Sequence, residues 1–139
     1  MIRTGILNPQ ISSLLARVRH TNILVIADRG FPFFPTIETI DISLVDDSPT
    51  VLQVLGAIRP NFDIAGIQMA EEFTAENTLE VQKEFAEATA GILLTYLPHA
   101  DLKERASLAI GLIRTGDTTQ YANVILESGR VDVNRKLSS

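Results

Sequence analysis

Residues 19–32 read RHTNILVIADRGFP, and they contain the strongest structural signal of the chain. Residues 23–27 are five consecutive apolar residues, three of them β-branched, which is typical of a strand buried on both faces inside a parallel sheet. His20 precedes this run and Asp28 follows it, before a glycine and a proline turn the chain. Ligands of open α/β sheets bind where strands end. The stretch therefore supplies two candidate site residues, His20 and Asp28.

Length and composition narrow the possible functions. A chain of 139 residues suits one domain with its own core. The absence of cysteine excludes disulfides, thiolate metal sites and cysteine nucleophiles. A net charge of −5 without clustered Lys and Arg argues against binding to nucleic acid. No apolar run approaches the ~20 residues that span a bilayer, and the first residues lack the apolar segment of a secretory signal. We therefore expect a cytoplasmic protein that contacts no membrane.

The apolar spacing predicts alternating helices and strands. Asn8 is a good N-cap before a proline, and the helix that it starts is expected to end at His20. Asn77 is expected to cap a later helix. The other expected helices cover 50–58, 78–89 and a segment that starts at Pro98. The expected strands cover 23–27, 37–44, 64–70, 92–97, 109–113 and 122–126. This alternation predicts an α/β fold, a single three-layer α/β/α domain over residues 1–126 with a mixed, mostly parallel sheet, and a polar tail over 127–139.

The titratable residues favour acid–base chemistry without a cofactor. The chain has no glycine-rich phosphate loop, and its two histidines lie 79 positions apart without the paired spacing of metal-binding helices. We therefore expect no metal and no cofactor. A histidine that titrates near ~6.5 is suited to proton transfer at neutral pH, and Asp28 could orient a ligand hydroxyl. The residues alone leave a second interpretation open, in which His20 only caps the first helix and His99 only begins a later one.

Several segments, in order along nearly the whole chain, resemble the D-ribose pyranase and L-fucose mutarotase (RbsD/FucU) family. They are Gly5-Ile6-Leu7-Asn8, Arg19-His20-Thr21, Ala27-Asp28, Val51-Leu52-Gln53-Val54-Leu55-Gly56, Ala70-Glu71-Glu72, His99 with Lys103, Ile113-Arg114-Thr115-Gly116-Asp117 and Tyr121-Ala122-Asn123-Val124-Ile125-Leu126. The resemblance implies an RbsD-like fold and a cytoplasmic isomerase that interconverts ring forms or anomers of a free monosaccharide. It implies no cofactor, and a ring-shaped homo-oligomer, an octamer or a decamer.

The resemblance also assigns roles to individual residues. His20 matches the catalytic proton donor. The sugar-contacting positions are matched by Asp28, His99, Lys103, Tyr121, Ala122 and Asn123. The chain departs from the family at Arg29, where relatives usually have alanine, in a bulkier loop at residues 31–35 and in a longer tail, so the sugar stays open. The alternative function is a sugar-binding or regulatory module on the same fold without turnover.

Ring opening needs one group to take the proton of the anomeric hydroxyl and another to protonate the ring oxygen. His20 is the expected donor; the second group could be His99, Asp28 or a bound water. An extended chain of seven residues between His20 and Asp28 would separate their side chains by more than 20 Å, at ~3.3 Å per residue. One monosaccharide cannot touch both, so we expect an active site at the interface between subunits.

Overall fold

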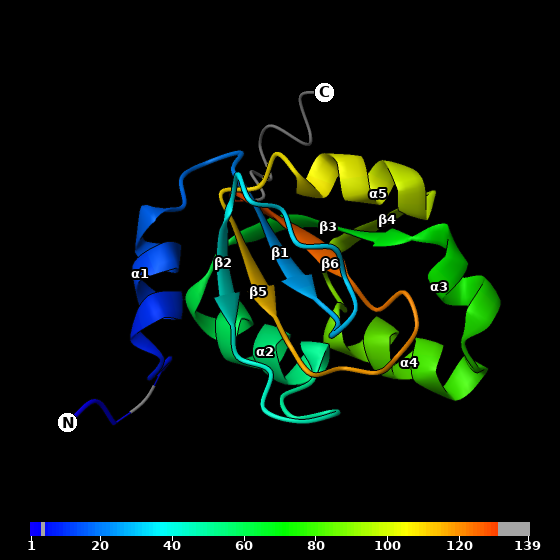
Figure 1. Ribbon diagram of the computed structural model, residues 1–139, viewed down its shortest axis with the longest axis horizontal. Coiled ribbons are helices and arrows are strands. Elements are labelled where there is room, and N and C mark those ends of the chain that lie inside the picture. The colour runs from blue at the N-terminus through cyan, green and yellow to red at the C-terminus, as the bar shows by residue number, and fades with distance from the viewer. Residues whose placement is uncertain (4, 131–139) are drawn as a thin grey trace.

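The computed structural model describes residues 1–3 and 5–130, and its central element is β1 (Ile23–Ala27), the strand predicted from the apolar run (Figure 1). All five residues of β1 are buried. The helices are α1 (Pro9–Arg17), α2 (Val51–Ile58), the 3₁₀ turn η1 (Arg59–Asn61), α3 (Glu71–Glu76), α4 (Leu79–Ala88) and α5 (His99–Ala106). The other strands are β2 (Glu38–Asp41), β3 (Ile64–Ala70), β4 (Leu93–Leu97), β5 (Gly111–Arg114) and β6 (Val124–Ser128).

The strands form one six-stranded sheet in the order β2-β5-β1-β6-β3-β4. β6 runs antiparallel to both of its neighbours, β1 and β3, whereas the other neighbouring pairs are parallel. The predicted mixed, mostly parallel sheet is therefore confirmed. Five strands end at the same edge of the sheet, and β6 begins there, so residues that follow the five strands meet residues that precede the sixth.

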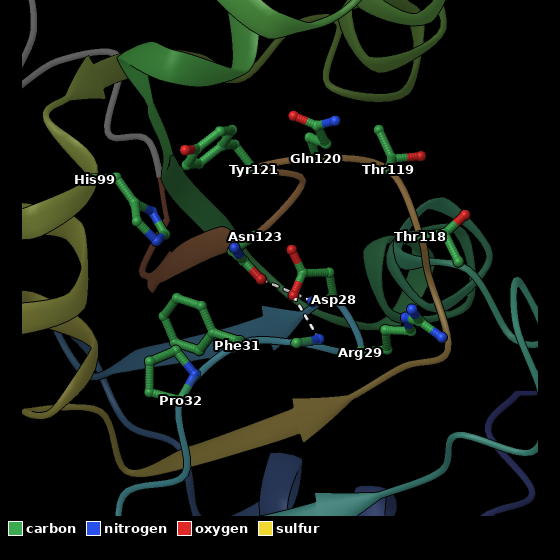
Figure 2. Close-up of a pocket in the computed structure, with 11 residues that line it drawn as sticks. Asp28, Arg29, Phe31, Pro32, His99, Thr118, Thr119, Gln120, Tyr121 and Asn123 are labelled. Carbon is green, nitrogen blue, oxygen red and sulfur yellow. Dashed lines mark hydrogen bonds between the residues drawn. The ribbon is translucent and has the colours of Figure 1, made fainter.

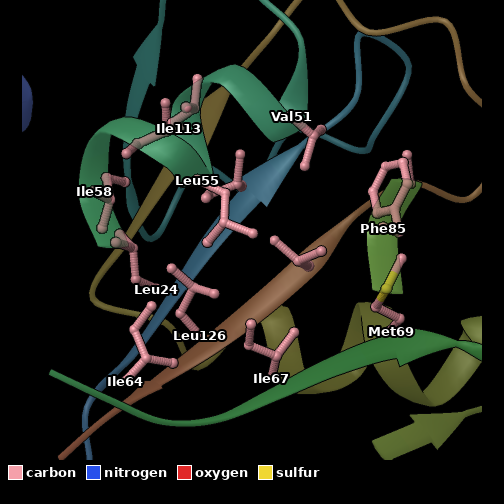
Figure 3. Close-up of a cluster of buried hydrophobic side chains, with 14 of the residues drawn as sticks. Leu24, Val51, Leu55, Ile58, Ile64, Ile67, Met69, Phe85, Ile113 and Leu126 are labelled. Atoms are coloured by element: carbon pink, nitrogen blue, oxygen red, sulfur yellow. The ribbon is translucent and has the colours of Figure 1, made fainter. Parts of the chain in front are cut away.

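Two apolar clusters pack on the two faces of the sheet and make the three layers. On one face, α1, α2 and α4 cover Leu24 and Leu126, with Leu55 of α2 and Phe85 of α4 in the same cluster (Figure 3). On the other face, α5 and the loop after β1 cover residues such as Val25. Alternate residues of β1 thus enter opposite clusters, as expected for a strand with two buried faces.

Side-chain caps fix where three helices begin. Asn8 Oδ1 accepts the N–H of Ile11 (2.9 Å) at the start of α1, as predicted. Thr50 and Gln53 form a reciprocal capping box at the start of α2. The predicted cap Asn77 was wrong, because Thr78 caps α4 and Asn77 follows the last residue of α3.

Several predicted boundaries differ from the structure. The first helix ends at Arg17, before His20, because Asn22 Oδ1 accepts the N–H of Arg19 (2.7 Å) and closes a turn there. The last strand begins at Val124, two residues later than predicted. Tyr121, shortly before it, has a left-handed backbone (φ 55°) that a strand does not accept. Of the residues 37–44 that were predicted to form a strand, only Glu38–Asp41 (β2) do so.

α3 had not been predicted at all. The predicted domain end at residue 126 falls inside β6, and residues 131–139 of the predicted tail lie outside the described residues. None of the helices in the described part of the chain has the length and apolar character needed to cross a membrane.

Candidate active site

An open cavity of about 350 Å³ lies at the sheet edge where the parallel strands end (Figure 2). It is lined by residues 28–32 after β1, by residues 118–121 and Asn123 before β6, and by His99 at the start of α5. Four predicted site residues, Asp28, His99, Tyr121 and Asn123, therefore meet at one cavity. They are up to 95 positions apart in sequence, and the shared edge of the sheet brings them together.

Asp28 is the first residue after β1, and its backbone and side chain are both fixed. Its N–H donates to Oδ1 of Asn123 (2.7 Å), and its own Oδ1 accepts the N–H of Gly30 (3.0 Å), a local turn typical of aspartate. Burial raises the pKa of the Asp28 carboxyl above its ordinary value of 3.8. The hydrogen bonds of Gly30 and Asn123 lower this pKa, and the nearby charge of Asp117 raises it further.

The loop after β1 is held by groups from the neighbouring strand β5. The guanidinium of Arg114 donates to the carbonyl oxygens of Asp28, Arg29 and Pro32, each at 3.3 Å. At the rim, Arg29 pairs with Asp46 (2.6 Å), and both side chains are largely exposed. Arg29, the departure from the family pattern, thus lies in the cavity wall.

The loop between β5 and β6 is organised by a buried carboxylate, Asp117, of which only 3% is exposed. One oxygen accepts the N–H of Thr119 (2.8 Å), and the other accepts the N–H of Val51 (2.9 Å) at the start of α2, where the helix dipole favours a negative charge. Tyr121 follows in its left-handed conformation. Such strained residues persist where surrounding structure fixes them, often at functional sites.

His99 lies between two aromatic rings at one end of the cavity. Its imidazole meets the ring of Tyr121 edge-on at 5.0 Å between centroids and the ring of Phe31 at 6.1 Å. Burial, and then the positive charge of Lys103, lower the pKa of His99 below its ordinary value of 6.5, against smaller opposing effects of Glu72 and Asp28. Two titratable groups of the cavity, His99 and Asp28, are therefore shifted toward their uncharged forms.

The remaining predicted site residues lie elsewhere. Lys103 is one turn after His99 on α5 and is half-buried outside the cavity lining. Ala122 is fully buried in the core beneath the cavity. His20 is exposed near the opposite end of β1, where a Cβ added at Gly129 would come within 2.9 Å of its Nδ1. The structure of the single chain does not bring His20 to the cavity.

The strand between His20 and Asp28 is shorter than predicted. Residues 21–27 are not all extended, because Thr21 has a left-handed backbone (φ 70°) and only the five residues of β1 form a strand. β1 alone spans about 17 Å at ~3.3 Å per residue. The predicted separation of more than 20 Å was therefore based on too long a strand, but His20 and Asp28 still lie beyond its opposite ends.

Sequence reasoning missed Thr118, Thr119 and Gln120, which line the cavity. It also missed the carboxylates that hold two of them, Asp117 for Thr119 and Asp47 for Thr118. The only signal was a run of polar residues, TGDTTQ, between two apolar segments. The bulkier loop at residues 31–35 contributes Phe31 to the cavity lining. Phe31 is buried against His99, whereas Phe33 is largely exposed. Among residues 1–3 and 5–130, no three His, Asp or Glu side chains are close enough together to hold a metal ion.

Known proteins match this chain over nearly its whole length. The model of the RbsD / FucU transport protein family matches residues 1–131. A D-ribose pyranase from Geobacillus kaustophilus (strain HTA426) is 38% identical over 129 residues, 93% of this chain and 94% of that protein. A D-ribose pyranase from Halalkalibacterium halodurans is 39% identical over 129 residues, 93% of this chain and 98% of that protein.

Solved structures agree with these matches. The structure of Bacillus subtilis RbsD complexed with D-ribose has a TM-score of 0.87 and 32% identity, and covers 95% of this chain and 100% of that chain. The fucose mutarotase from Streptococcus pneumoniae, in complex with L-fucose, has a TM-score of 0.73 and 22% identity, and covers 90% of this chain and 94% of that chain. The second likeness shows the shared fold.

Proposed function

This chain belongs to the RbsD/FucU family, and from that premise we propose that it is an isomerase that interconverts ring forms or anomers of a free monosaccharide. The observation that carries the proposal is the cavity at the sheet edge, where Asp28, His99, Tyr121 and Asn123 converge. Relatives that match over 93% of this chain are D-ribose pyranases. D-ribose is therefore the first substrate to test, and L-fucose the second.

The reaction requires proton transfers and the cleavage and re-formation of one carbon–oxygen bond. Opening the ring breaks the bond between the anomeric carbon and the ring oxygen, while the anomeric hydroxyl loses a proton and the ring oxygen gains one. Closure by a different hydroxyl, or on the other face of the carbonyl, gives the other ring form or anomer. Positioned acid–base groups typically accelerate such steps ~10²–10⁴-fold. No electron is transferred, so the reaction is complete without a redox cofactor.

The cavity offers complementary groups for sugar hydroxyls. The Asn123 amide and the Tyr121 hydroxyl can donate and accept hydrogen bonds, and the Asp28 carboxylate can accept them from two adjacent hydroxyls. Lys103 and Ala122 remain predicted sugar contacts, the latter through its backbone, since its methyl group lies in the core. Phe31 gives an apolar surface for one face of the ring.

The proton donor in this proposal is His20 of a neighbouring subunit. The support is geometric, because His20 and Asp28 lie beyond opposite ends of β1 in one chain, while the cavity is open to a partner. The protein would then act as a ring-shaped homo-oligomer, an octamer or a decamer, with each active site at an interface. We also propose that it works in the cytoplasm and that its catalytic domain includes all of β6.

Saturation-transfer NMR on D-ribose, with L-fucose and other reducing sugars in parallel, tests this function directly. Irradiating the signal of one ring form should reduce the signals of the others. The exchange rate calculated from this loss should rise in proportion to enzyme concentration and lie well above the rate in buffer. Binding to a sugar without faster exchange would instead favour the sugar-binding or regulatory module. Exchange at the buffer rate for every sugar would overturn the isomerase function.

A further inference from the structure

The first turn of α5 begins without a cap of its own. The residue before it is Pro98, whose side chain has no hydrogen-bond acceptor. The N–H of His99, a group that the helix itself cannot satisfy, donates instead to both carboxylate oxygens of Glu72, at 3.0 and 3.2 Å. We infer that Glu72 is a positioning residue for His99, which it fixes in the cavity from a neighbouring helix.

Strand register explains why these two residues meet. β3 and β4 are parallel neighbours, and their last residues, Ala70 and Leu97, are paired. Glu72 and His99 each lie two positions beyond these partners, in the first turns of α3 and α5. The sheet thus delivers the carboxylate and the helix start to the same place, although 27 positions separate them in sequence.

The imidazole has little else to hold it. Its Nδ1 is buried and has no hydrogen-bond partner among the described residues, so no side chain sets the ring through that nitrogen. Its remaining packing against Phe31 and Tyr121 is edge-on contact between rings. The hydrogen bonds to Glu72 therefore hold the His99 backbone, and with it the point from which the ring extends to the cavity.

Glu72 also affects the charge of His99. The charged groups around the imidazole are Glu72 from α3, Lys103 on its own helix and Asp28 from the loop after β1. The carboxylates favour the imidazolium, and Lys103 opposes it. Removing the charge of Glu72 while keeping an oxygen acceptor should leave the ring in place and lower the pKa of His99.

The chain has two histidines, so NMR can follow the Hε1 proton of each, with His20→Ala assigning the signals. In Glu72→Ala the Hε1 signal of His99 should lose the ring-current shift that Tyr121 and Phe31 impose. In Glu72→Gln that shift should persist while the titration midpoint falls. Glu71→Ala and Glu71→Gln, on the exposed preceding residue of the same helix, should change neither. Equal behaviour of the Glu71 and Glu72 variants would overturn the inference.

These signals do not depend on turnover, so they test the inference even if the proposed function fails. The effect on turnover rests on the proposed function. If that function holds, Glu72→Ala should slow sugar exchange roughly 10- to 100-fold, and Glu72→Gln should keep most of the exchange rate. Circular dichroism on each variant verifies folding; if Glu72→Ala does not fold, the lowered His99 midpoint in Glu72→Gln decides. Full exchange in a folded Glu72→Ala would count against positioning.

Discussion

Burial shifts the pKa values of Asp28 and His99 in the cavity in opposite directions, and both shifts favour the uncharged form. It raises the pKa of the Asp28 carboxyl and lowers that of the His99 imidazole, so each group is pushed toward its uncharged form. A cavity that disfavours charge suits a neutral sugar whose hydroxyls exchange protons with positioned side chains.

The His99 shift predicts how exchange and stability depend on pH. We expect the Hε1 titration of His99 to have its midpoint below 6.5, and exchange that needs the neutral imidazole to persist down to that midpoint and fall below it. Because the folded-state pKa is lower than the unfolded one, the unfolded chain binds more protons between the two values. The His99 contribution to stability is therefore complete above about 6.5 and is lost as the pH falls. A midpoint above 6.5 would contradict this prediction.

Asp28 has the reverse effect on stability. Its folded-state pKa is raised, so the native protein binds more protons than the unfolded chain between 3.8 and the folded value. Its contribution is present at pH values below 3.8 and is lost as the pH rises through the folded value. Asp28→Asn should remove this dependence, so the difference in unfolding free energy between the variant and the parent chain should change with pH across that window. A constant difference would show that Asp28 does not titrate there.

His20→Ala tests the proposed proton donor. His20 is exposed and outside the helix, so the variant should fold and keep weak sugar binding. Exchange measured by saturation transfer should fall ~10²–10⁴-fold, the typical contribution of an acid–base group. Unchanged exchange would rule out His20 as the donor.

Two glycines in different elements predict stability changes of opposite sign. At Gly111 in β5, an added Cβ would lie 2.5 Å from Leu14 Cδ2 of α1, and both residues are buried. Gly111→Ala should therefore cost about 1–3 kcal/mol. At Gly56, inside α2, a Cβ meets nothing within 4 Å, so Gly56→Ala should stabilise the fold by up to about 1 kcal/mol. Urea denaturation measures both, and equal signs would contradict the packing.

The elements that sequence reasoning predicted are those with local signals. β1 has its apolar run, and α1 and α2 have caps within their own segments. α3 has no such signal: it follows β3 directly, and its N-cap residue, Ala70, makes no side-chain hydrogen bond. The loop at residues 117–119 is held by contacts between distant residues: Asp117 accepts from Val51, 66 positions away, and Thr118 donates to Asp47, 71 positions away. No local sequence pattern indicates such contacts. Asp28 was identified because it follows a predicted strand, and His99 because it matches a sugar-contacting position of the family.

At the scale of the whole molecule, the proposal of an active site shared between subunits predicts complementation. His20→Ala and Asp28→Ala proteins, each inactive alone, should regain partial exchange after they are mixed, dissociated and reassembled. Some interfaces would then combine an intact His20 with an intact Asp28. Native mass spectrometry verifies co-assembly. Mixed assemblies without activity would place the whole site within one chain.

The expected independence from metals is testable on the assembled protein. Exhaustive treatment with a chelator should leave exchange rates unchanged, because the proposed reaction uses only protein groups and water. A control with the chelator alone excludes effects on the sugar. Loss of exchange that added zinc restores would mean that a metal takes part.

The position of β6 has a consequence for how the chain can be made. Of the strands in residues 5–130, β6 is synthesised last, yet it lies between β1 and β3 and joins β2, β5 and β1 to β3 and β4. Before residues 124–128 emerge from the ribosome, the nascent chain can form only two partial sheets, each with an unpaired strand edge where β6 belongs. Such edges favour pairing with other chains. The complete sheet can therefore form only after residues 124–128 have been synthesised, and a chain truncated before residue 124 would be an open, aggregation-prone product.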